Sequence, residues 1–464
     1  MRYISTRGAA PVLGFEAAMM TGLARDGGLY LPESVPHLTP AEIAAMAGAP
    51  YEEIALRVIR PFVAEAFDAA TLARLIAGAY AGFGHPARAP LVQIGPGHFL
   101  LELFHGPTLA FKDFAMQLLG RMMQEALGRS GGRVTIVGAT SGDTGSAAIE
   151  AFAGLEGVDV FILFPDGRVS DVQRRQMTTP DAPNVHALAL AGDFDDCQAR
   201  VKDLFNDHAF RDRVGLAGVN SINWARILAQ IVYYFAAATA LGAPHRAVDF
   251  TVPTGNFGDV FAGEMARRMG LPVGRLIVAT NHNDILHRTL QTGVATPEPV
   301  RPSISPSMDI QVSSNFERAL FLAHEGDAAA VADLMAAQKA GRPFAIAPEA
   351  LARLRAAFAS GRVSEEETRA TIARTHAQTG ELLCPHSAVG VAVAERHVGA
   401  APMVTLATAH PAKFPDAVEA APGIRPPLPE RMAGLHSRPE RVTRIANDLG
   451  GLRALILERI GQAA

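Results

Sequence analysis

Lys112 stands in the stretch FHGPTLAFKDF, where Pro107 and Thr108 suit a turn and cap before the expected start of a helix. Apolar residues then recur at helical spacing, so the lysine lies in the first turn beside a buried face. Burial and the positive end of the helix dipole both lower the pKa of an amine there. Such an amine suits Schiff-base chemistry with a carbonyl compound. A solvated lysine paired with Asp113 or a glutamate is the alternative, which this stretch alone favours.

The run GATSGDTGSAA at residues 138–148 predicts an anion-binding loop before a helix expected from about Ser146. Its glycines free backbone amides, and hydroxyls stand among them at a helix start. The positions concerned are Gly138, Thr140, Ser141, Gly142, Thr144 and Gly145. Asp143 is unusual in such a site and could instead cap the helix or accept a bond from a ligand. The run lacks the Gly-Lys-Ser/Thr ending of a nucleotide P-loop, and a well-capped turn is the alternative interpretation.

A second glycine-rich run, TGNFGDVFAG at residues 254–263, also lies between an expected strand and an expected helix. Gly255 and Gly258 allow close backbone approach, and a helix N-terminus favours a phosphate. The run does not match G-x-G-x-x-G, so it does not predict a dinucleotide site. Taken alone, a tight turn with a helix cap explains this loop equally well.

Two later segments also contain groups that suit anions. The run SPSMDIQVSSNFERAL at residues 305–320 places three polar side chains and an arginine around an expected helix start, which suits a phosphate or carboxylate. These are Ser313, Ser314, Asn315 and Arg318. An ordinary capped helix is an equal alternative. In LATAHPAKF at residues 406–414, Thr408 could present a hydroxyl at a strand end and Lys413 could meet a phosphate.

Metal sites and hydrolytic triads are not predicted. His324 and Glu325 begin like a zinc-protease motif, but Ala328 stands where the second histidine belongs. There is no G-x-S-x-G nucleophile motif. Cys197 and Cys384 are far apart, which fits a reducing compartment and excludes a cysteine-based zinc site.

Strands and helices alternate along most of the chain and must position these groups. Strand-like runs lie at residues 99–104, 133–137, 158–164, 248–253, 275–280 and 402–408. This alternation predicts an α/β fold with parallel sheets and helices on both faces. Ligands bind at the carboxyl ends of strands in such sheets, where both glycine-rich loops lie. Residues 328–378 are alanine-rich and predict a helical insertion, with Ser364 and Glu367 spaced as a capping box.

The composition predicts a soluble cytoplasmic protein. At 464 residues the chain is long enough for two or three domains. Its net charge of -4 argues against nucleic-acid binding. The N-terminus does not resemble a signal peptide. Residues 227–244 carry no charge, but their glutamine, tyrosines and terminal glycine and proline favour a buried helix over a membrane span.

One lysine with a lowered pKa, two anion loops and no dinucleotide motif together suit pyridoxal 5'-phosphate. This cofactor needs a lysine for a Schiff base, a cup for its phosphate and a partner for its ring nitrogen. An amino-acid substrate then needs a second cup for its carboxylate. The rival from another class is a non-catalytic protein that binds phosphate or a nucleotide, and it would be colourless when purified.

The motifs together resemble the threonine synthase family, in the longer form found in many bacteria and in fungi. They are FHGPTLAFKD (104–113), GATSGDTGSAA (138–148), SINWARILAQIVYYF (221–235), VPTGNFGD (252–259), SPSMDIQVSSNFER (305–318) and TAHPAKF (408–414). The resemblance runs in one order from the first residues to at least Phe414, which outweighs the solvated-lysine alternative. It implies the fold of the tryptophan-synthase-β-like pyridoxal phosphate enzymes, known as fold type II.

The resemblance also implies a division into domains. A mixed helical N-terminal domain would span residues 1–95. A large cofactor-binding α/β domain would comprise residues 96–130 and 245–464, with a helical insertion at about residues 320–380. A small α/β domain at residues 131–244 would carry the SGDTG loop.

Residue roles follow from the same resemblance. Lys112 would hold the cofactor through a Schiff base and act as general acid and base, and Thr408 would bond to the ring nitrogen. The cofactor phosphate would lie on Gly255, Asn256, Phe257, Gly258 and Asp259. The substrate carboxylate and the cofactor ring would lie against Ser141, Gly142, Asp143 and Thr144, and Thr140 would also bind the substrate. For the substrate phosphate, the first choice is Ser313, Ser314, Asn315 and Arg318, and the second choice is Lys413.

The implied reaction converts O-phospho-L-homoserine and water to L-threonine and phosphate, the last step of threonine biosynthesis. It is a lyase reaction that joins γ-elimination to addition of water at the β-carbon. The runner-up within the same cofactor class is a threonine or serine dehydratase, or a β-replacement enzyme. No metal, nucleic acid or membrane is expected, and the chain is expected to be a monomer or homodimer.

Overall fold

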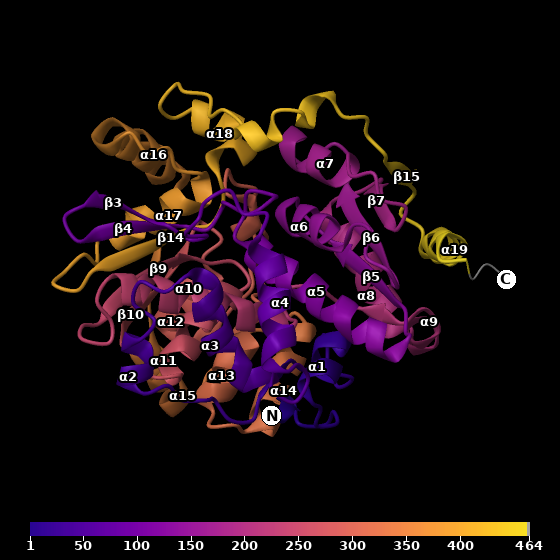
Figure 1. Ribbon diagram of the computed structural model, residues 1–464, viewed down its shortest axis with the longest axis horizontal. Helices are drawn as coiled ribbons and strands as arrows, with labels where there is room; N and C mark the ends of the chain where they lie inside the picture. The colour runs from indigo at the N-terminus through magenta and orange to yellow at the C-terminus, as the bar shows by residue number, and fades with distance from the viewer. Residues whose placement is uncertain (462–464) are drawn as a thin grey trace.

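The computed structural model describes residues 1–461, in which two β-sheets lie side by side (Figure 1). The larger sheet has six strands in the order β13-β10-β9-β14-β4-β3, and all neighbours are parallel except β3, which is antiparallel to β4. Its strands are β3 (Leu91–Gly95), β4 (His98–Glu102), β9 (Val248–Pro253), β10 (Val273–Thr280), β13 (Phe358–Arg362) and β14 (Met403–Ala407). Every residue of β9 is buried, as expected for a central parallel strand covered on both faces.

The smaller sheet has five parallel strands in the order β15-β7-β6-β5-β8. They are β5 (Val134–Ala139), β6 (Val158–Pro165), β7 (Val185–Leu190), β8 (Leu216–Ala217) and β15 (Thr443–Ile445). Helices α6 (Asp143–Phe152), α7 (Asp171–Thr178), α8 (Phe194–Asn206) and α9 (His208–Val214) follow strands of this sheet or lie between them. The parallel α/β fold predicted from the alternating pattern is therefore confirmed.

Helix α10 (Trp224–Ala240) packs against α3 (Tyr51–Val63), α5 (Lys112–Ser130) and α11 (Gly258–Arg268). Almost all of its residues are buried, which confirms the expectation of a core helix for the uncharged segment. Among residues 1–461, no helix is long and apolar enough to cross a membrane.

The remaining elements cover the two sheets and connect them. The helices are α1 (Phe15–Thr21), α2 (Pro40–Ala44), α4 (Ala69–Tyr80), α12 (Ile285–Thr292), α13 (Phe316–Ala323), α14 (Ala328–Lys339), α15 (Pro348–Ala357), α16 (Glu365–Thr379), α17 (Pro385–Ala394), α18 (Pro415–Glu419) and α19 (Leu449–Arg459). The short strands are β1 (Tyr3–Ser5), β2 (Tyr30–Pro32), β11 (Val294–Ala295) and β12 (Phe344–Ala345), and the 3-10 turns are η1 (Pro306–Met308), η2 (Pro411–Lys413), η3 (Glu430–Met432) and η4 (Leu435–Ser437).

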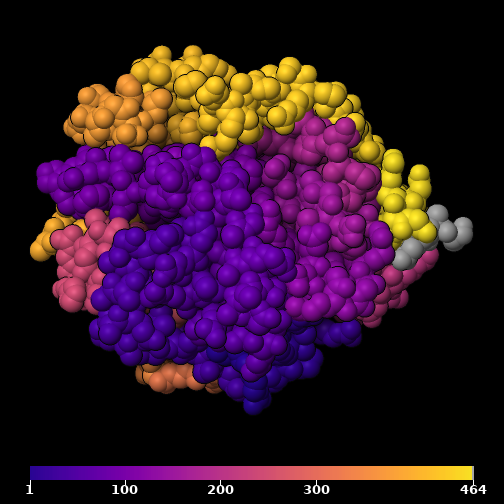
Figure 2. Space-filling model, viewed as in Figure 1, coloured from indigo at the N-terminus to yellow at the C-terminus, as the bar shows by residue number. Residues whose placement is uncertain are grey.

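Three pairings differ from the expected domain boundaries. β3 belongs to the larger sheet, although its residues were assigned to the N-terminal domain. β13, which lies inside the expected helical insertion, pairs with β10 and forms an edge of the same sheet. β15 pairs with β7, so the end of the chain joins the smaller sheet and not the larger one. Figure 2 shows this C-terminal segment running along the edge of the molecule over the part that contains the smaller sheet.

The local capping predictions are only partly correct. Ser364 and Glu367 form the expected capping box at the start of α16. The cap predicted before α5 is wrong, because the N-cap residue is Phe111 and no side chain caps it. The Thr108 amide and hydroxyl instead donate to the Asp113 carboxylate, at 2.9 and 2.6 Å. Asp113 therefore closes the turn that leads into the helix, and it is not the partner of the lysine.

Candidate active site

The turn before Lys112 is fixed by contacts with the strand end that carries Thr408. The backbone amide of Phe111 donates to the Thr408 carbonyl at 2.9 Å, and Ala110 and Ala409 form an isolated antiparallel bridge. Leu109 has a φ of 65°, a left-handed conformation that is uncommon for a residue with a side chain. Thr408 is buried at the carboxyl end of β14. The structure therefore brings these two predicted residues together at the edge where parallel sheets bind ligands.

The amine of Lys112 is buried beside one carboxylate. The residue is 9% exposed, and its Nζ lies 3.4 Å from Oδ2 of Asp143 and 4.9 Å from the centre of the Phe111 ring. Burial lowers the pKa of Lys112, and the charges of Lys413 and Arg226 lower it further, whereas Asp143 acts in the opposite direction. The lowered pKa confirms the direction expected from the sequence and favours a nucleophilic amine.

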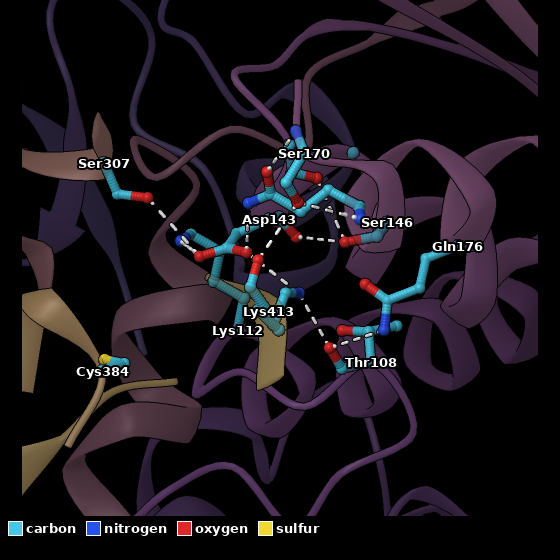
Figure 3. Close-up of polar contacts among 12 residues, drawn as sticks. Thr108, Lys112, Asp143, Ser146, Ser170, Gln176, Ser307, Cys384 and Lys413 are labelled. Carbon is cyan, nitrogen blue, oxygen red and sulfur yellow. Dashed lines mark hydrogen bonds and ion pairs between the residues drawn. The ribbon is translucent and has the colours of Figure 1, made fainter. Parts of the chain in front are cut away.

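Asp143 is the centre of the polar cluster drawn in Figure 3. Its Oδ1 lies 2.9 Å from Nζ of Lys413 and accepts a hydrogen bond of 2.9 Å from Nε2 of Gln173. Burial by itself would raise the pKa of this carboxyl, but the charges of Lys413 and Lys112 outweigh burial and hold the pKa well below its usual range. Asp143 is therefore a fixed anion between two lysines.

Lys413 is enclosed by protein groups. It is completely buried, and its ammonium donates to the Thr108 carbonyl at 2.8 Å in addition to its ion pair with Asp143. Because the amine is already held by two protein groups, the geometry favours a role in holding Asp143. We prefer this role to the one predicted from the sequence, in which Lys413 was the second choice for binding the substrate phosphate.

The SGDTG loop is shaped by Thr140, whose hydroxyl accepts hydrogen bonds of 2.9 Å from the amides of Gly142 and Gly145. Thr140 is therefore occupied within the loop. The amides of Ser141, Asp143 and Thr144 donate to no protein group in the described part of the chain. They lie at the N-terminus of α6, where a carboxylate is favoured by free amides and by the helix dipole.

The GNFGD loop offers a second set of free amides at the N-terminus of α11. Across residues 1–461, the backbone amides of residues 255–259 donate to no protein group. Phe257 has a left-handed φ of 62° and buries its ring against Phe316 and Phe358, so the aromatic anchor holds the loop in this conformation. The donor set suits a phosphate, and it fits the cofactor group that the sequence predicted here.

The carboxyl of Asp259 points away from this donor set. It is 6% exposed and accepts hydrogen bonds from the hydroxyls of Tyr233 and Tyr234. Burial raises its pKa to about 7, and the two phenols and Lys112 act in the opposite direction. Only the backbone amide of Asp259 is therefore suited to a phosphate, and the side chain belongs to the core behind the loop.

Asp259 is expected to make the protein less stable as the pH rises. Its pKa in the folded state is about 7, whereas an unfolded aspartate has a pKa of about 3.9. Between these values the native state binds more protons than the unfolded state, so the free energy of unfolding falls with pH. An asparagine still accepts hydrogen bonds from the phenols. Between about pH 5.5 and about pH 8, the free energy of unfolding should therefore fall by about 2 kcal/mol more in wild type than in Asp259→Asn.

Urea unfolding of wild type and Asp259→Asn at both pH values measures this difference. Asp333→Asn, which changes a carboxyl on α14, is the matched control and should follow wild type. Equal losses of stability in wild type and Asp259→Asn would contradict the buried, protonated state of Asp259.

The polar residues before α13 contact the GNFGD loop. Ser313 donates to the Gly255 carbonyl at 2.7 Å, and the Asn315 side chain donates to the Asn256 carbonyl at 3.0 Å. Ser314 donates weakly to the Asn256 side chain at 3.4 Å. These contacts favour a supporting role for the cluster that was the first choice for the substrate phosphate.

Arg318 is a correction to the predicted site. Its side chain is completely buried, donating to the Tyr30 carbonyl at 2.7 and 3.0 Å, to the Ile222 carbonyl at 2.6 Å and to the Asn315 side chain. Burial lowers its pKa to about 9. The guanidinium joins the N-terminal strand β2, α13 and the turn before α10, so it is a structural link and not an anion ligand.

Arg318→Met is therefore expected to lower stability without changing substrate affinity. Several buried acceptors lose their donor, which should reduce the free energy of unfolding by about 3 kcal/mol or more. Thermal unfolding measures the loss, and Arg60→Met, at an exposed position on α3, is the control. A folded Arg318→Met with normal stability and a KM for a phosphorylated substrate raised about tenfold would restore the phosphate role.

Arg226 is a candidate ligand that the sequence analysis did not single out. It lies in the first turn of α10 and is 3% exposed, and its Nε has no hydrogen-bond partner among residues 1–461. One hydrogen bond of 3.2 Å goes to the Val219 carbonyl, and no carboxylate of the described chain forms an ion pair with it. Its charge is close enough to lower the pKa of Lys112. A buried guanidinium without a counterion suits an anionic ligand.

Family models of threonine synthase match both ends of the chain. The model described as threonine synthase N terminus matches residues 2–80, that of pyridoxal-phosphate dependent enzymes matches residues 85–342, and that of threonine synthase, C-terminal, matches residues 387–456. A threonine synthase from Pseudomonas aeruginosa is 54% identical over 459 residues, which cover 98% of each chain.

Solved structures show the same likeness over the whole fold. The crystal structure of pyridoxal phosphate-bound threonine synthase from Brucella melitensis is 57% identical, with a TM-score of 0.96 over 99% of both chains. The threonine synthase from yeast is 38% identical, with a TM-score of 0.92 over 99% of both chains.

Proposed function

The chain belongs to the threonine synthase family, and from this premise we propose how its residues form L-threonine and phosphate from O-phospho-L-homoserine and water. The protein is a pyridoxal phosphate-dependent lyase of fold type II. One observation carries the assignment of roles: the buried amine of Lys112 lies beside Asp143. Asp143 begins α6, and α6 and α11 are two helices whose N-terminal amides are free among the described residues. A monomer or homodimer is the expected assembly.

The residues around Lys112 fit pyridoxal phosphate. The free amides of residues 255–259 would hold its phosphate, Lys112 would carry it covalently, and the hydroxyl of Thr408 would face its ring nitrogen. When bound, the cofactor supplies an electron sink for the carbons next to the substrate amine. A hydroxyl beside the ring nitrogen, unlike a carboxylate, leaves that nitrogen largely unprotonated.

Lys112 would move the protons of the reaction. Its amine would take the α-proton of the bound substrate and return protons at neighbouring carbons as phosphate leaves and water adds. Its lowered pKa suits a base, and Asp143 keeps it close by remaining ionised. The burial of this pair excludes bulk water from the proton being moved.

Two anion sites would hold the substrate. The free amides of Ser141, Asp143 and Thr144 suit its carboxylate at the start of α6. The unpaired guanidinium of Arg226 suits its phosphate, in the role first assigned to Arg318. Together these sites would hold the two ends of phosphohomoserine and leave its central carbons facing Lys112.

The deciding experiment measures threonine and phosphate together from O-phosphohomoserine with the purified protein. Threonine synthase activity gives equal amounts of both products. A dehydratase would release ammonia and a keto acid and would not need the phosphorylated substrate. A colourless protein that binds phosphate and releases none would contradict the enzyme assignment altogether.

Arg226→Met is expected to weaken binding of the substrate phosphate. Two lost charge-assisted hydrogen bonds should lower kcat/KM for phosphohomoserine by about a hundredfold and raise the inhibition constant of inorganic phosphate in parallel. Arg60→Met is the control, and the absorbance of the bound cofactor should not change in either variant. Unchanged inhibition by phosphate would remove Arg226 from the substrate site.

A further inference from the structure

Ser307 connects the cluster around Asp143 to the loop that carries the free amides of residues 255–259. It lies in η1, and its hydroxyl donates to Oδ2 of Asp143 at 3.4 Å. Nζ of Lys112 lies 3.4 Å from the same oxygen. Figure 3 shows Ser307 and Lys413 approaching Asp143 from different sides.

The backbone of Ser307 is held at both ends. Its amide donates to Nε2 of His386 at 3.1 Å, and its carbonyl packs so closely on Gly255 that a Cβ there would lie only 2.6 Å away. Gly255 is therefore required by the approach of this carbonyl. One short turn thus touches both loops that the proposed function assigns to anions.

His386 is suited to be a permanent acceptor for this amide. It is 3% exposed in the first turn of α17, and burial lowers its pKa to about 4 against the opposing charge of Asp143. Because Nε2 accepts from Ser307, the ring proton lies on Nδ1, which is 4.0 Å from Sγ of Cys384. Phe414 packs at 4.8 Å between ring centres. The imidazole is therefore neutral and fixed in one orientation.

We propose that Ser307 is a positioning residue that holds Asp143 in place for Lys112, and that His386 fixes Ser307 by accepting its backbone hydrogen bond. This inference rests on the proposed function and adds two residues to it. Each time Lys112 turns away to react, Oδ2 of Asp143 loses one partner and keeps the Ser307 hydroxyl. Oδ1 keeps Lys413 and Gln173. The carboxylate then stays in position for the returning amine.

Ser307→Ala and Ser307→Thr test the hydroxyl in the holoenzyme. Ser307→Ala should lower kcat about tenfold with KM within about twofold of wild type, because a hydrogen bond to a charged group is lost. The pH midpoint of the cofactor's colour change, which reports protonation of the lysine nitrogen bound to it, should fall. A carboxylate that is no longer held in place stabilises the protonated form of that nitrogen to a smaller extent. Ser307→Thr keeps a hydroxyl and should restore both values. Ser34→Ala, at an exposed position, is the control.

His386→Gln and His386→Phe test the backbone contact independently. The glutamine offers an oxygen that can accept the Ser307 amide and should retain most activity, whereas the phenylalanine cannot and should behave like Ser307→Ala. His208→Gln, on the exposed face of α9, is the control. These variants decide the matter if Ser307→Ala does not fold.

The proposal is overturned if Ser307→Ala, or His386→Phe, keeps both the wild-type kcat and the wild-type colour midpoint. A parallel loss in Ser307→Ala and Ser307→Thr would also overturn it, because space and not the hydroxyl would then be decisive. Wild-type production of threonine and phosphate in the same assays keeps the proposed function separate from this outcome.

Discussion

Lys112→Ala is expected to abolish formation of threonine and phosphate, with kcat lowered about 10⁵-fold or more. The same amine would hold the cofactor and move every proton of the reaction. Lys202 and Lys339, the two lysines outside the cluster, are exposed and therefore do not replace it. The loss should exceed that of any single binding contact, because the same amine would serve both to hold the cofactor and to move the protons. The pKa of the buried Asp143 carboxyl is held well below its usual range. The carboxylate therefore stays ionised and does not replace the lysine in moving protons to and from the substrate carbons.

Two measurements check this expectation. Product formation is followed with wild type, Lys112→Ala and the exposed control Lys202→Ala. Borohydride treatment followed by peptide mapping should then fix the chromophore on Lys112 in wild type and in Lys202→Ala only. Covalent attachment to another lysine in wild type, or more than about 1% residual kcat in Lys112→Ala, would contradict the assignment.

The sequence predicted the groups whose environment is local. The strand at residues 248–253 and the glycine-rich loop after it are adjacent in the chain, so periodicity and turn chemistry alone place free amides at a helix start. For this loop the information lies within about two helical turns of the residues concerned. The burial of Lys112 is different, because its own stretch alone favours a solvated lysine and only the resemblance along the chain outweighs that interpretation.

Long-range contacts decide the parts that were not predicted. Arg226 and Arg318 both stand in the first turn of a helix beside polar residues, and both are buried. They differ because the carbonyls of Tyr30 and Ile222 close around Arg318, whereas Arg226 meets one carbonyl. No pattern near either arginine records this difference.

The same reason explains the misplaced strands. β15 has three residues and β13 contains glycine and arginine, so neither has the apolar pattern of a buried strand. Each is recognised as a strand only by the neighbour that pairs with it at a sheet edge. Edge strands have one partner and one free side, so their sequences are weakly constrained.

Lys413→Met is expected to lower kcat at least about a hundredfold while the protein stays folded and coloured. The substitution keeps the length of the buried side chain but leaves Asp143 with Lys112 as its one remaining cation, and that cation must leave during each turnover. Removing one partner of a buried ion pair costs about 3–5 kcal/mol, because the remaining charge is neither solvated nor paired. Asp143 should respond by taking up a proton or by turning away from Lys112.

The pH dependence separates this role from direct binding of substrate phosphate. If Lys413 holds Asp143 ionised, Lys413→Met should raise the pKa of that carboxyl, so activity should be lost on the acidic side and partly recovered as the pH rises. Inhibition by inorganic phosphate should be unchanged, and Lys202→Met should match wild type. Weaker inhibition by phosphate together with an unmoved acidic limb would return Lys413 to the phosphate site, because a cation that binds the substrate acts on affinity and not on the ionisation of Asp143.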